Sequence, residues 1–184
     1  MSDFDGRAYQ ARFDALARQG MDVHGEATLV RSFAPSSVLD AGCGTGRVAI
    51  ELARDGIETV GVDVDESMIT EARRRAPTLA WLQADLCKLD LRRSFDVIVL
   101  AGNVPLFCPP ASRPGLVGAC AAHLAASGVM VAGFQLDQRY DIDDYDGACT
   151  AAGLVLRDRW STWDRKPFSQ EANYAVSVHG RELS

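Results

Sequence analysis

The sequence predicts an α/β fold, a three-layer doubly wound sandwich around a seven-stranded, mostly parallel sheet. After residue 36, short apolar runs alternate with longer amphipathic segments, which is typical of strands and helices arranged around a parallel sheet. Only residues 164–171 separate the last two apolar runs, too few for a crossover helix, so the last strand is expected to be antiparallel. The chain of 184 residues has the length of one domain.

Residues 1–35 are predicted to form a helical cap, and residues 36–184 the core of the same domain. Apolar residues of the first helix recur at three- and four-residue steps: Phe4, Ala8, Ala11 and Ala15. Gly20 interrupts this pattern, and Pro35 ends the segment.

The core is predicted to contain seven strands, at residues 38–41, 58–63, 79–83, 95–101, 128–136, 154–163 and 172–179. The amphipathic segments between them predict helices at residues 46–54, 66–75, 112–126 and 142–152. Open α/β sheets bind ligands at the carboxyl ends of their strands, so the loops that follow the strands are the candidates for a site.

The charge balance argues against broad electrostatic binding of nucleic acids or anionic membranes. Lysine and arginine number 19 against 25 aspartates and glutamates, which gives a net charge of −6 with no basic stripe. No apolar run approaches the ~20 residues of a membrane-spanning helix, and the start of the chain lacks the pattern of a secretion signal. We therefore expect a cytoplasmic protein, either a monomer or a homodimer.

No metal site is predicted. The closest two of the five cysteines are 12 positions apart, so zinc and CxxC redox sites have no local support, and reduced, mostly buried thiols are expected. One acidic run invites a calcium interpretation: Asp137, Asp141, Asp143, Asp144 and Asp146. A calcium loop starting at Asp141 would need Asp or Asn where Tyr145 stands and glycine where Asp146 stands. Acids in the first turn of a helix explain the run better, because they complement the helix dipole.

The most informative segment is VLDAGCGTG, residues 38–46, where a strand ends and a helix follows. Its three glycines allow a sharp turn and close approach to a ligand, and the N–H groups of the helix point to the same place. Asp40, two residues before the first glycine, can accept hydrogen bonds from an ammonium group or from water. A dinucleotide fingerprint would need a third glycine where Arg47 stands, which disfavours a nicotinamide-dependent oxidoreductase.

Acidic residues also follow the next two predicted strands. Asp63 lies 21 positions after Gly42, where a carboxylate can accept both hydroxyls of a ribose, or it caps the following helix. Asp85 follows the third strand, where it can read an adenine edge or cap a turn. Ala101 and Gly102 end the fourth strand beside the first, at the point where such sheets place ligands.

These features resemble the class I S-adenosylmethionine-dependent methyltransferases of the small-molecule type, from about Ser37 to the C-terminal hairpin; the D-x-G-x-G-x-G spelling at residues 40–46 is the most specific match. The resemblance implies S-adenosylmethionine as cofactor, a small-molecule acceptor, and a sheet whose reversed strand lies between the fifth and sixth. The residues it implies for the methionyl end are Asp40, Gly42, Cys43, Gly44 and Gly46. Those it implies for the nucleoside are Asp63, Val64, Met68, Asp85 and Leu86. Met68 also fits a core position, and Cys43 a packing role rather than a nucleophile.

The catalytic candidates are His24 and Asn103. Methyl transfer from a sulfonium is a direct displacement that needs alignment more than a base. His123 and His179 fall on the edge opposite the ligand, whereas the N-terminal segment of the family commonly covers the cofactor, so His24 is the histidine that remains. Asn103 either orients a ligand or terminates the strand.

The acceptor pocket is expected between the N-terminal helices, the loop after Asn103 and the tip of the hairpin. Tyr9 and Phe13, one helical turn apart, offer an apolar wall or belong to the core. The hairpin tip carries Trp163, Asp164, Arg165 and Phe168. A non-catalytic module that binds the cofactor to regulate a partner remains an alternative.

Overall fold

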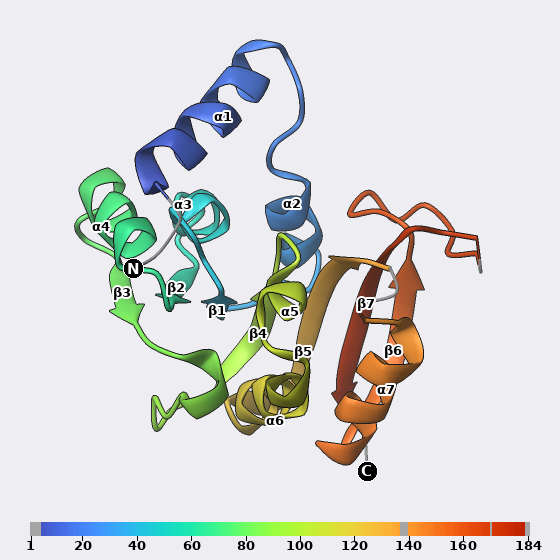
Figure 1. Cartoon of the computed structure of the whole chain (residues 1–184). Helices are drawn as coiled ribbons and strands as arrows, with labels where there is room; N and C mark the ends of the chain where they lie inside the picture. The colour runs from blue at the N-terminus through green and yellow to red at the C-terminus, as the bar shows by residue number, and fades with distance from the viewer. Residues whose placement is uncertain (1–4, 137–139, 170, 183–184) are drawn as a thin grey trace.

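The computed structural model describes residues 5–136, 140–169 and 171–182, and it contains one seven-stranded sheet (Figure 1). The strands are β1 (Ser37–Ala41), β2 (Glu58–Asp63), β3 (Ala80–Gln83), β4 (Phe95–Leu100), β5 (Leu124–Gln135), β6 (Leu154–Trp160) and β7 (Tyr174–Arg181). Their order is β3-β2-β1-β4-β5-β7-β6, and β7 runs antiparallel to both of its neighbours. The predicted α/β fold with a reversed last strand is confirmed.

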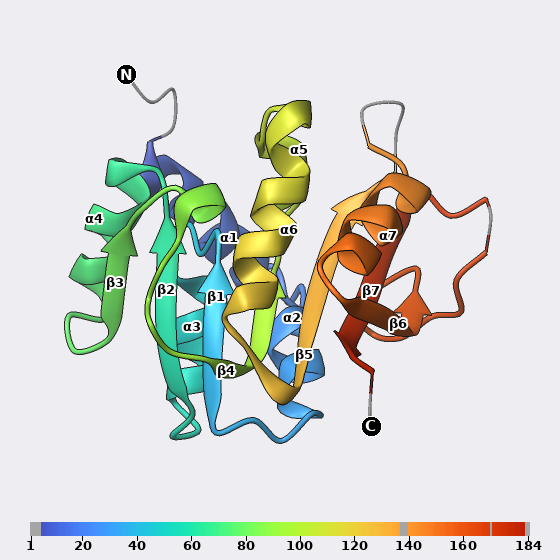
Figure 2. The same ribbon diagram turned by 90° about the horizontal axis from the view of Figure 1, so that it is seen from below.

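Helices cover both faces of the sheet, as Figure 2 shows. The core helices are α3 (Arg47–Ala53), α4 (Glu66–Arg75), α6 (Arg113–Ala122) and α7 (Ile142–Ala151), and the N-terminal ones are α1 (Gly6–Arg18) and α2 (Gly25–Arg31). On one face α6 and α7 bury a large apolar cluster against the strands. On the other, α2, α3 and α4 bury two smaller clusters, which completes the three layers.

Two predicted boundaries are wrong for identifiable reasons. The helix expected over residues 112–126 ends at Ala122, because Leu124 already pairs with Phe95 at the start of β5 and is buried. The strand expected to reach Trp163 ends at Trp160, because the chain turns there and the amide of Ser161 donates to the carbonyl of Lys166. The short elements α5 (Val104–Phe107), η1 (Leu86–Lys88) and η2 (Pro110–Ser112) are absent from the sequence prediction. They are one turn or less, too short for a periodic pattern.

Gly46 joins β1 to α3 in a left-handed conformation, with φ of 80°. A Cβ atom built on it would lie 2.3 Å from Cη2 of Trp81, whose indole N–H donates to the carbonyl of Ala76 at 2.8 Å. We expect Gly46→Ala to lower the free energy of unfolding by about 3 kcal/mol, from overpacking and from the strained φ. Chemical denaturation measures this loss.

The double variant Gly46→Ala/Trp81→Leu separates the two causes. Removing the indole leaves only the backbone strain, so the Gly46→Ala change should cost less in the Trp81→Leu background than in the wild type. An equal cost in both backgrounds would show that the contact with Trp81 is unimportant.

Candidate active site

A cavity of about 420 Å³ opens at the carboxyl ends of β1, β2 and β4. Residues from the three loops that follow these strands line it, together with residues of α1 and η1. Eleven of the twelve residues predicted to bind the cofactor are among them: Asp40, Gly42, Cys43, Gly44, Asp63, Val64, Met68, Asp85, Leu86, Ala101 and Gly102. The volume falls within the ~300–1,000 Å³ range of small-molecule sites.

Asp40 forms the acidic floor of the cavity at the end of β1. Its side chain is almost fully buried, and one carboxylate oxygen accepts the amide of Ala49 at 3.0 Å. Burial raises the pKa of Asp40 to about 7, although the Ala49 hydrogen bond and the charge of Arg47 oppose this shift. The site therefore holds a carboxyl group whose charged form is disfavoured by burial and would be stabilised by a cationic ligand.

Asp63 ties the tip of β2 to the glycine loop. One carboxylate oxygen accepts the amide of Gly44 at 2.8 Å, and the other accepts the amide of Asp65 at 2.9 Å. Burial raises the pKa of Asp63, while these hydrogen bonds oppose the increase. The alternative role of Asp63 as a helix cap is wrong, because Asp65 caps α4 by accepting the amides of Ser67 and Met68.

The other end of the cavity is mainly apolar. Met68 and Leu86 are buried there, and Val64 is 67% exposed at the rim. Asp85 accepts the amide of Cys87 at 2.9 Å, so the predicted turn cap is present, and the same side chain also lines the cavity. The two interpretations of Asp85 are therefore compatible.

Within the glycine loop, Gly46 has a role other than the predicted one, whereas Cys43 fits the packing role that the sequence favoured. Gly46 does not line the cavity, because it faces the ring of Trp81. Cys43 lines the cavity but is buried, and burial together with the charges of Asp40 and Asp63 raises the pKa of its thiol well above the usual value. A thiol kept neutral in this way is a packing group and not a nucleophile.

The structure does not bring either catalytic candidate into the cavity wall. His24 begins α2, and its Nδ1 lies 3.8 Å from a carboxylate oxygen of Glu51 on the outer part of α3. The Oδ1 atom of Asn103 accepts the amide of Gln135 at 2.8 Å, so this side chain joins the ends of β4 and β5. The strand-terminating role of Asn103 is the one that the geometry supports.

The four residues of the hairpin tip do not line the cavity. Trp163 packs against Gly133 of β5, and its indole N–H donates to the hydroxyl of Tyr174 at 3.1 Å. Arg165 donates to the hydroxyl of Ser32, and Phe168 lies beneath the guanidinium of Arg159. These contacts join the tip to α2 and to the sheet.

His123 lies at the opposite edge of the sheet, as predicted, whereas His179 lies level with the middle of the sheet. His123 accepts the amide of Leu91 at 2.8 Å, beside the start of β4. His179 pairs with Met130 in the middle of β5, and its Nε2 lies 3.2 Å from Asp146. Neither histidine lines the cavity.

Several residues that line the cavity were not predicted to bind the cofactor, although Tyr9 was predicted as an apolar wall for the acceptor or as core. Tyr9 of α1 reaches the cavity over the glycine loop, and Thr45 and Arg47 line it beside the first turn of α3. Arg47 forms a two-pronged ion pair with Glu26 of α2, with N–O distances of 2.8 and 2.6 Å. The mouth is completed by Val104, Phe107, Cys108, Pro109 and Ser112. The position of Arg47 after the last glycine was noticeable, but its partner depends on how α2 packs.

The described residues contain no candidate metal site. Among the described residues no group of three or more His, Cys, Asp or Glu side chains is placed to hold a metal ion. Asp141 caps α7 by accepting the amide of Asp144 at 2.8 Å, in agreement with the helix-dipole explanation, whereas Asp137 lies outside the described residues.

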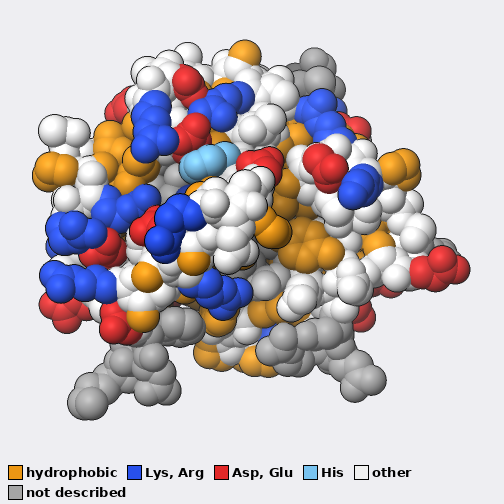
Figure 3. Space-filling view, turned by 90° about the horizontal axis from the view of Figure 1, so that it is seen from above, with side chains coloured by type: hydrophobic (Ala, Val, Ile, Leu, Met, Phe, Trp, Pro, Cys, Tyr) orange, Lys and Arg blue, Asp and Glu red, His pale blue; other side chains and the backbone are white. Residues whose placement is uncertain are grey.

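On the face seen in Figure 3, basic and acidic side chains are intermingled. Within the described ranges no helix is long and apolar enough to cross a membrane.

Comparisons with known proteins identify similar methyltransferases. The family model described as a methyltransferase domain matches residues 38–128. A crystal structure of a TehB-like SAM-dependent methyltransferase from Corynebacterium glutamicum is 33% identical, covers 96% of this chain and 98% of its own, and has a TM-score of 0.90. The SAM-bound structure of an amino pentose methyltransferase from Micromonospora echinaspora is 18% identical, covers 97% of this chain and 99% of its own, and shares the fold with a TM-score of 0.76.

A curated relative from Streptomyces venezuelae is a dTDP-3-amino-3,4,6-trideoxy-alpha-D-glucopyranose N,N-dimethyltransferase. It is 32% identical over 126 residues, which make up 67% of this chain and 52% of the relative. The chain spans about half or less of the length of the first curated relatives it matches.

Proposed function

The chain belongs to the S-adenosylmethionine-dependent methyltransferases, and we propose that it passes the methyl group of this cofactor to a small-molecule acceptor by direct displacement. The observation that carries the proposal is the pair of acids beside the glycine loop in one cavity, the buried Asp40 and the partly buried Asp63. A nicotinamide cofactor fits less well, because Arg47 occupies the place of the third fingerprint glycine.

The donor set of the cavity fits S-adenosylmethionine chemically. The raised pKa of Asp40 reflects a buried carboxyl group with little compensation by positive charge, and the ligand carries an ammonium and a sulfonium group. Asp40 and the glycine loop would hold the methionyl end, and Asp63 would hold the ribose. Val64 and Met68 would flank the adenine, and Asp85 would face its amino group.

When bound, S-adenosylmethionine supplies a methyl group on a positively charged sulfur. The chain contributes position and shielding. The glycine loop is held in place by Asp63 from β2, Tyr9 covers it from α1, and the buried carboxyl of Asp40 places negative charge beneath it. Fixing two reactants and excluding water are the effects from which such a displacement gains most.

The small cap supports a small acceptor. In the part of the chain that the structure describes, this cap consists of α1 and α2, and only six residues of the sequence separate the end of β5 from the start of α7. The Streptomyces venezuelae relative, whose name gives a nucleotide-linked amino sugar as acceptor, supports this size class. The predicted monomer or homodimer stays a prediction.

Titration calorimetry tests the cofactor assignment. We expect one saturable site per chain for S-adenosylmethionine and for S-adenosylhomocysteine, and no comparable heat with NADH. Folded protein that gives no saturable heat with either ligand would refute the proposal. A screen of small acceptors for S-adenosylhomocysteine release then separates an enzyme from a module that only binds the cofactor.

His24→Ala should leave methyl transfer essentially unchanged with an acceptor found in that screen. The imidazole contacts Glu51 and not the cavity, so its removal takes no group away from the reaction. Turnover under saturating cofactor, followed across pH, measures the effect. A fall of about 100-fold or more in kcat, which is the scale of general-base loss, would restore His24 as the base.

A further inference from the structure

Helix α1 lies over the glycine loop without an apolar anchor of its own. Of its 13 residues only Gly6 and Gln10 are buried. The rings of Tyr9 and Phe13 are partly exposed, with centroids 5.1 Å apart. A helix held by so little buried apolar surface belongs to the least stable part of a fold, from which moving elements are drawn.

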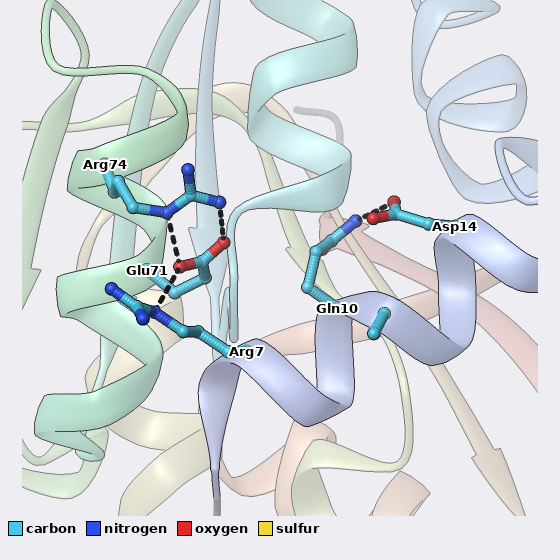
Figure 4. Close-up of a pocket in the computed structure, with 6 residues that line it drawn as sticks. Arg7, Gln10, Asp14, Glu71 and Arg74 are labelled. Atoms are coloured by element: carbon cyan, nitrogen blue, oxygen red, sulfur yellow. Dashed lines mark hydrogen bonds and ion pairs between the residues drawn. The ribbon is translucent and has the colours of Figure 1, made fainter.

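Gln10 makes a buried polar contact between α1 and the glycine loop. The hydroxyl of Thr45 donates to Oε1 of Gln10 at 2.6 Å, and both side chains are more than nine-tenths buried. Nε2 of Gln10 donates to Asp14 at 2.7 Å, one turn along the same helix, as Figure 4 shows. The two bonds satisfy the amide at both ends and fix its orientation.

Thr45 belongs to the cavity wall as well as to this contact. It stands between Gly44 and Gly46, lines the cavity, and its carbonyl accepts a guanidinium N–H of Arg75 at 2.7 Å. Movement of the glycine loop therefore moves the Thr45 hydroxyl, which donates the hydrogen bond to Gln10.

One other contact of α1 lies beside the glycine loop, where the guanidinium of Arg47 lies 4.8 Å from the ring centroid of Phe13; the remaining polar contacts lie away from the loop. Arg7 approaches Glu71 at 4.0 Å, but its side chain is 82% exposed, and Glu71 already pairs with Arg74 at 2.6 Å (Figure 4). The amide of Gly6 donates to the hydroxyl of Ser67 at 3.2 Å. An exposed ion pair contributes little to stability, so the buried Gln10–Thr45 bond is the stronger candidate for coupling.

We infer that Gln10 is a positioning residue that couples the docking of α1 to cofactor binding through Thr45. Cofactor in the cavity fixes the glycine loop, the fixed Thr45 hydroxyl holds Gln10, and α1 then keeps Tyr9 over the ligand. Coupling of this kind is reciprocal, so weakening the docking of α1 must weaken cofactor binding by the same factor. The inference rests on the proposed cofactor site.

Hydrogen exchange of the α1 amides, with and without S-adenosylhomocysteine, tests the coupling. In the wild type we expect the ligand to slow exchange in α1 by about tenfold. In Gln10→Ala the ligand should no longer slow it, and the dissociation constant should rise by about tenfold. Gln19→Ala makes the same chemical change at the exposed end of α1 and should behave as wild type.

A double-variant cycle identifies the partner of Gln10. Thr45→Val removes the hydroxyl at similar volume, so its effects on α1 protection and on the dissociation constant should equal those of Gln10→Ala. The double variant should show no larger effect than either single variant. Thr45→Ser keeps the hydroxyl and should keep the protection of α1. Ligand-dependent protection in Gln10→Ala equal to wild type, or strictly additive effects, would overturn the inference and leave the cofactor site intact. A wild type that binds no S-adenosylhomocysteine would overturn both.

Discussion

Asp40→Asn is expected to make the ligand-free protein more stable above pH 7 and, at the same time, to weaken cofactor binding. The pKa of Asp40 is about 7 in the folded chain, against about 3.9 in an unfolded one. Because the folded state holds this proton more tightly, the stability that Asp40 contributes is complete below about pH 4 and is lost as the pH rises through 7. Asparagine is always neutral and can still accept the amide of Ala49.

The gain from Asp40→Asn should therefore be absent near pH 4 and reach about 4 kcal/mol at pH 8, on the scale of 1.36 kcal/mol per pKa unit. Chemical denaturation of both proteins between pH 4 and pH 8 measures it. A difference that is constant with pH would mean that Asp40 titrates at its ordinary value in the folded chain.

Cofactor binding should show the opposite response to Asp40→Asn. If the carboxylate holds an ammonium group, affinity for S-adenosylhomocysteine falls about 10- to 100-fold in the variant, which is the loss of one or two charged hydrogen bonds. In the wild type this affinity should increase as the pH rises from 6 to 8, because binding favours the ionised form. 5′-Methylthioadenosine, which lacks the amino acid, is the matched control and should bind with little pH dependence.

The fold followed from the sequence because its signals are local. The alternation of apolar runs with amphipathic segments predicted the three layers. The short connection at residues 164–171 predicted the reversed strand. The start of β5 was missed because it depends on the pairing of Leu124 with Phe95, residues distant in the sequence. Pairing between distant strands leaves no mark in a sequence window of helical length.

The site residues that could be predicted are those set by local spacing, and the ones that were missed or misassigned depend on tertiary contacts. Asp40 and Asp63 were found because their spacing from the glycines is fixed by one strand–helix–strand unit. Gly46 was assigned to the cofactor site. The structure shows instead that glycine is required there because Trp81 on β3 leaves no room for a side chain. His24 was selected because topology removed the other two histidines and the family resemblance placed the N-terminal segment over the cofactor, and only the packing of α2 on α3 shows that it faces Glu51. Gln10 gave no sequence signal, because its partner Thr45 lies 35 positions away.

Asp63→Ala is expected to weaken binding of S-adenosylhomocysteine by about 10- to 200-fold. The carboxylate is proposed to hold the ribose hydroxyls, and hydrogen bonds to a charged group contribute about 1.5–3 kcal/mol each. Removing it also frees the amides of Gly44 and Asp65, so part of the loss comes from a looser glycine loop. Titration calorimetry gives the total effect.

Paired ligands separate the contact with ribose from the support of the loop. Wild-type protein should bind 5′-methylthioadenosine about tenfold more tightly than its 2′-deoxy analogue, whereas Asp63→Ala should bind the two almost equally. Loop support alone would weaken both ligands by the same factor and preserve their ratio. A preserved ratio would therefore assign Asp63 to the hydrogen bond with Gly44 and would require another group to hold the ribose.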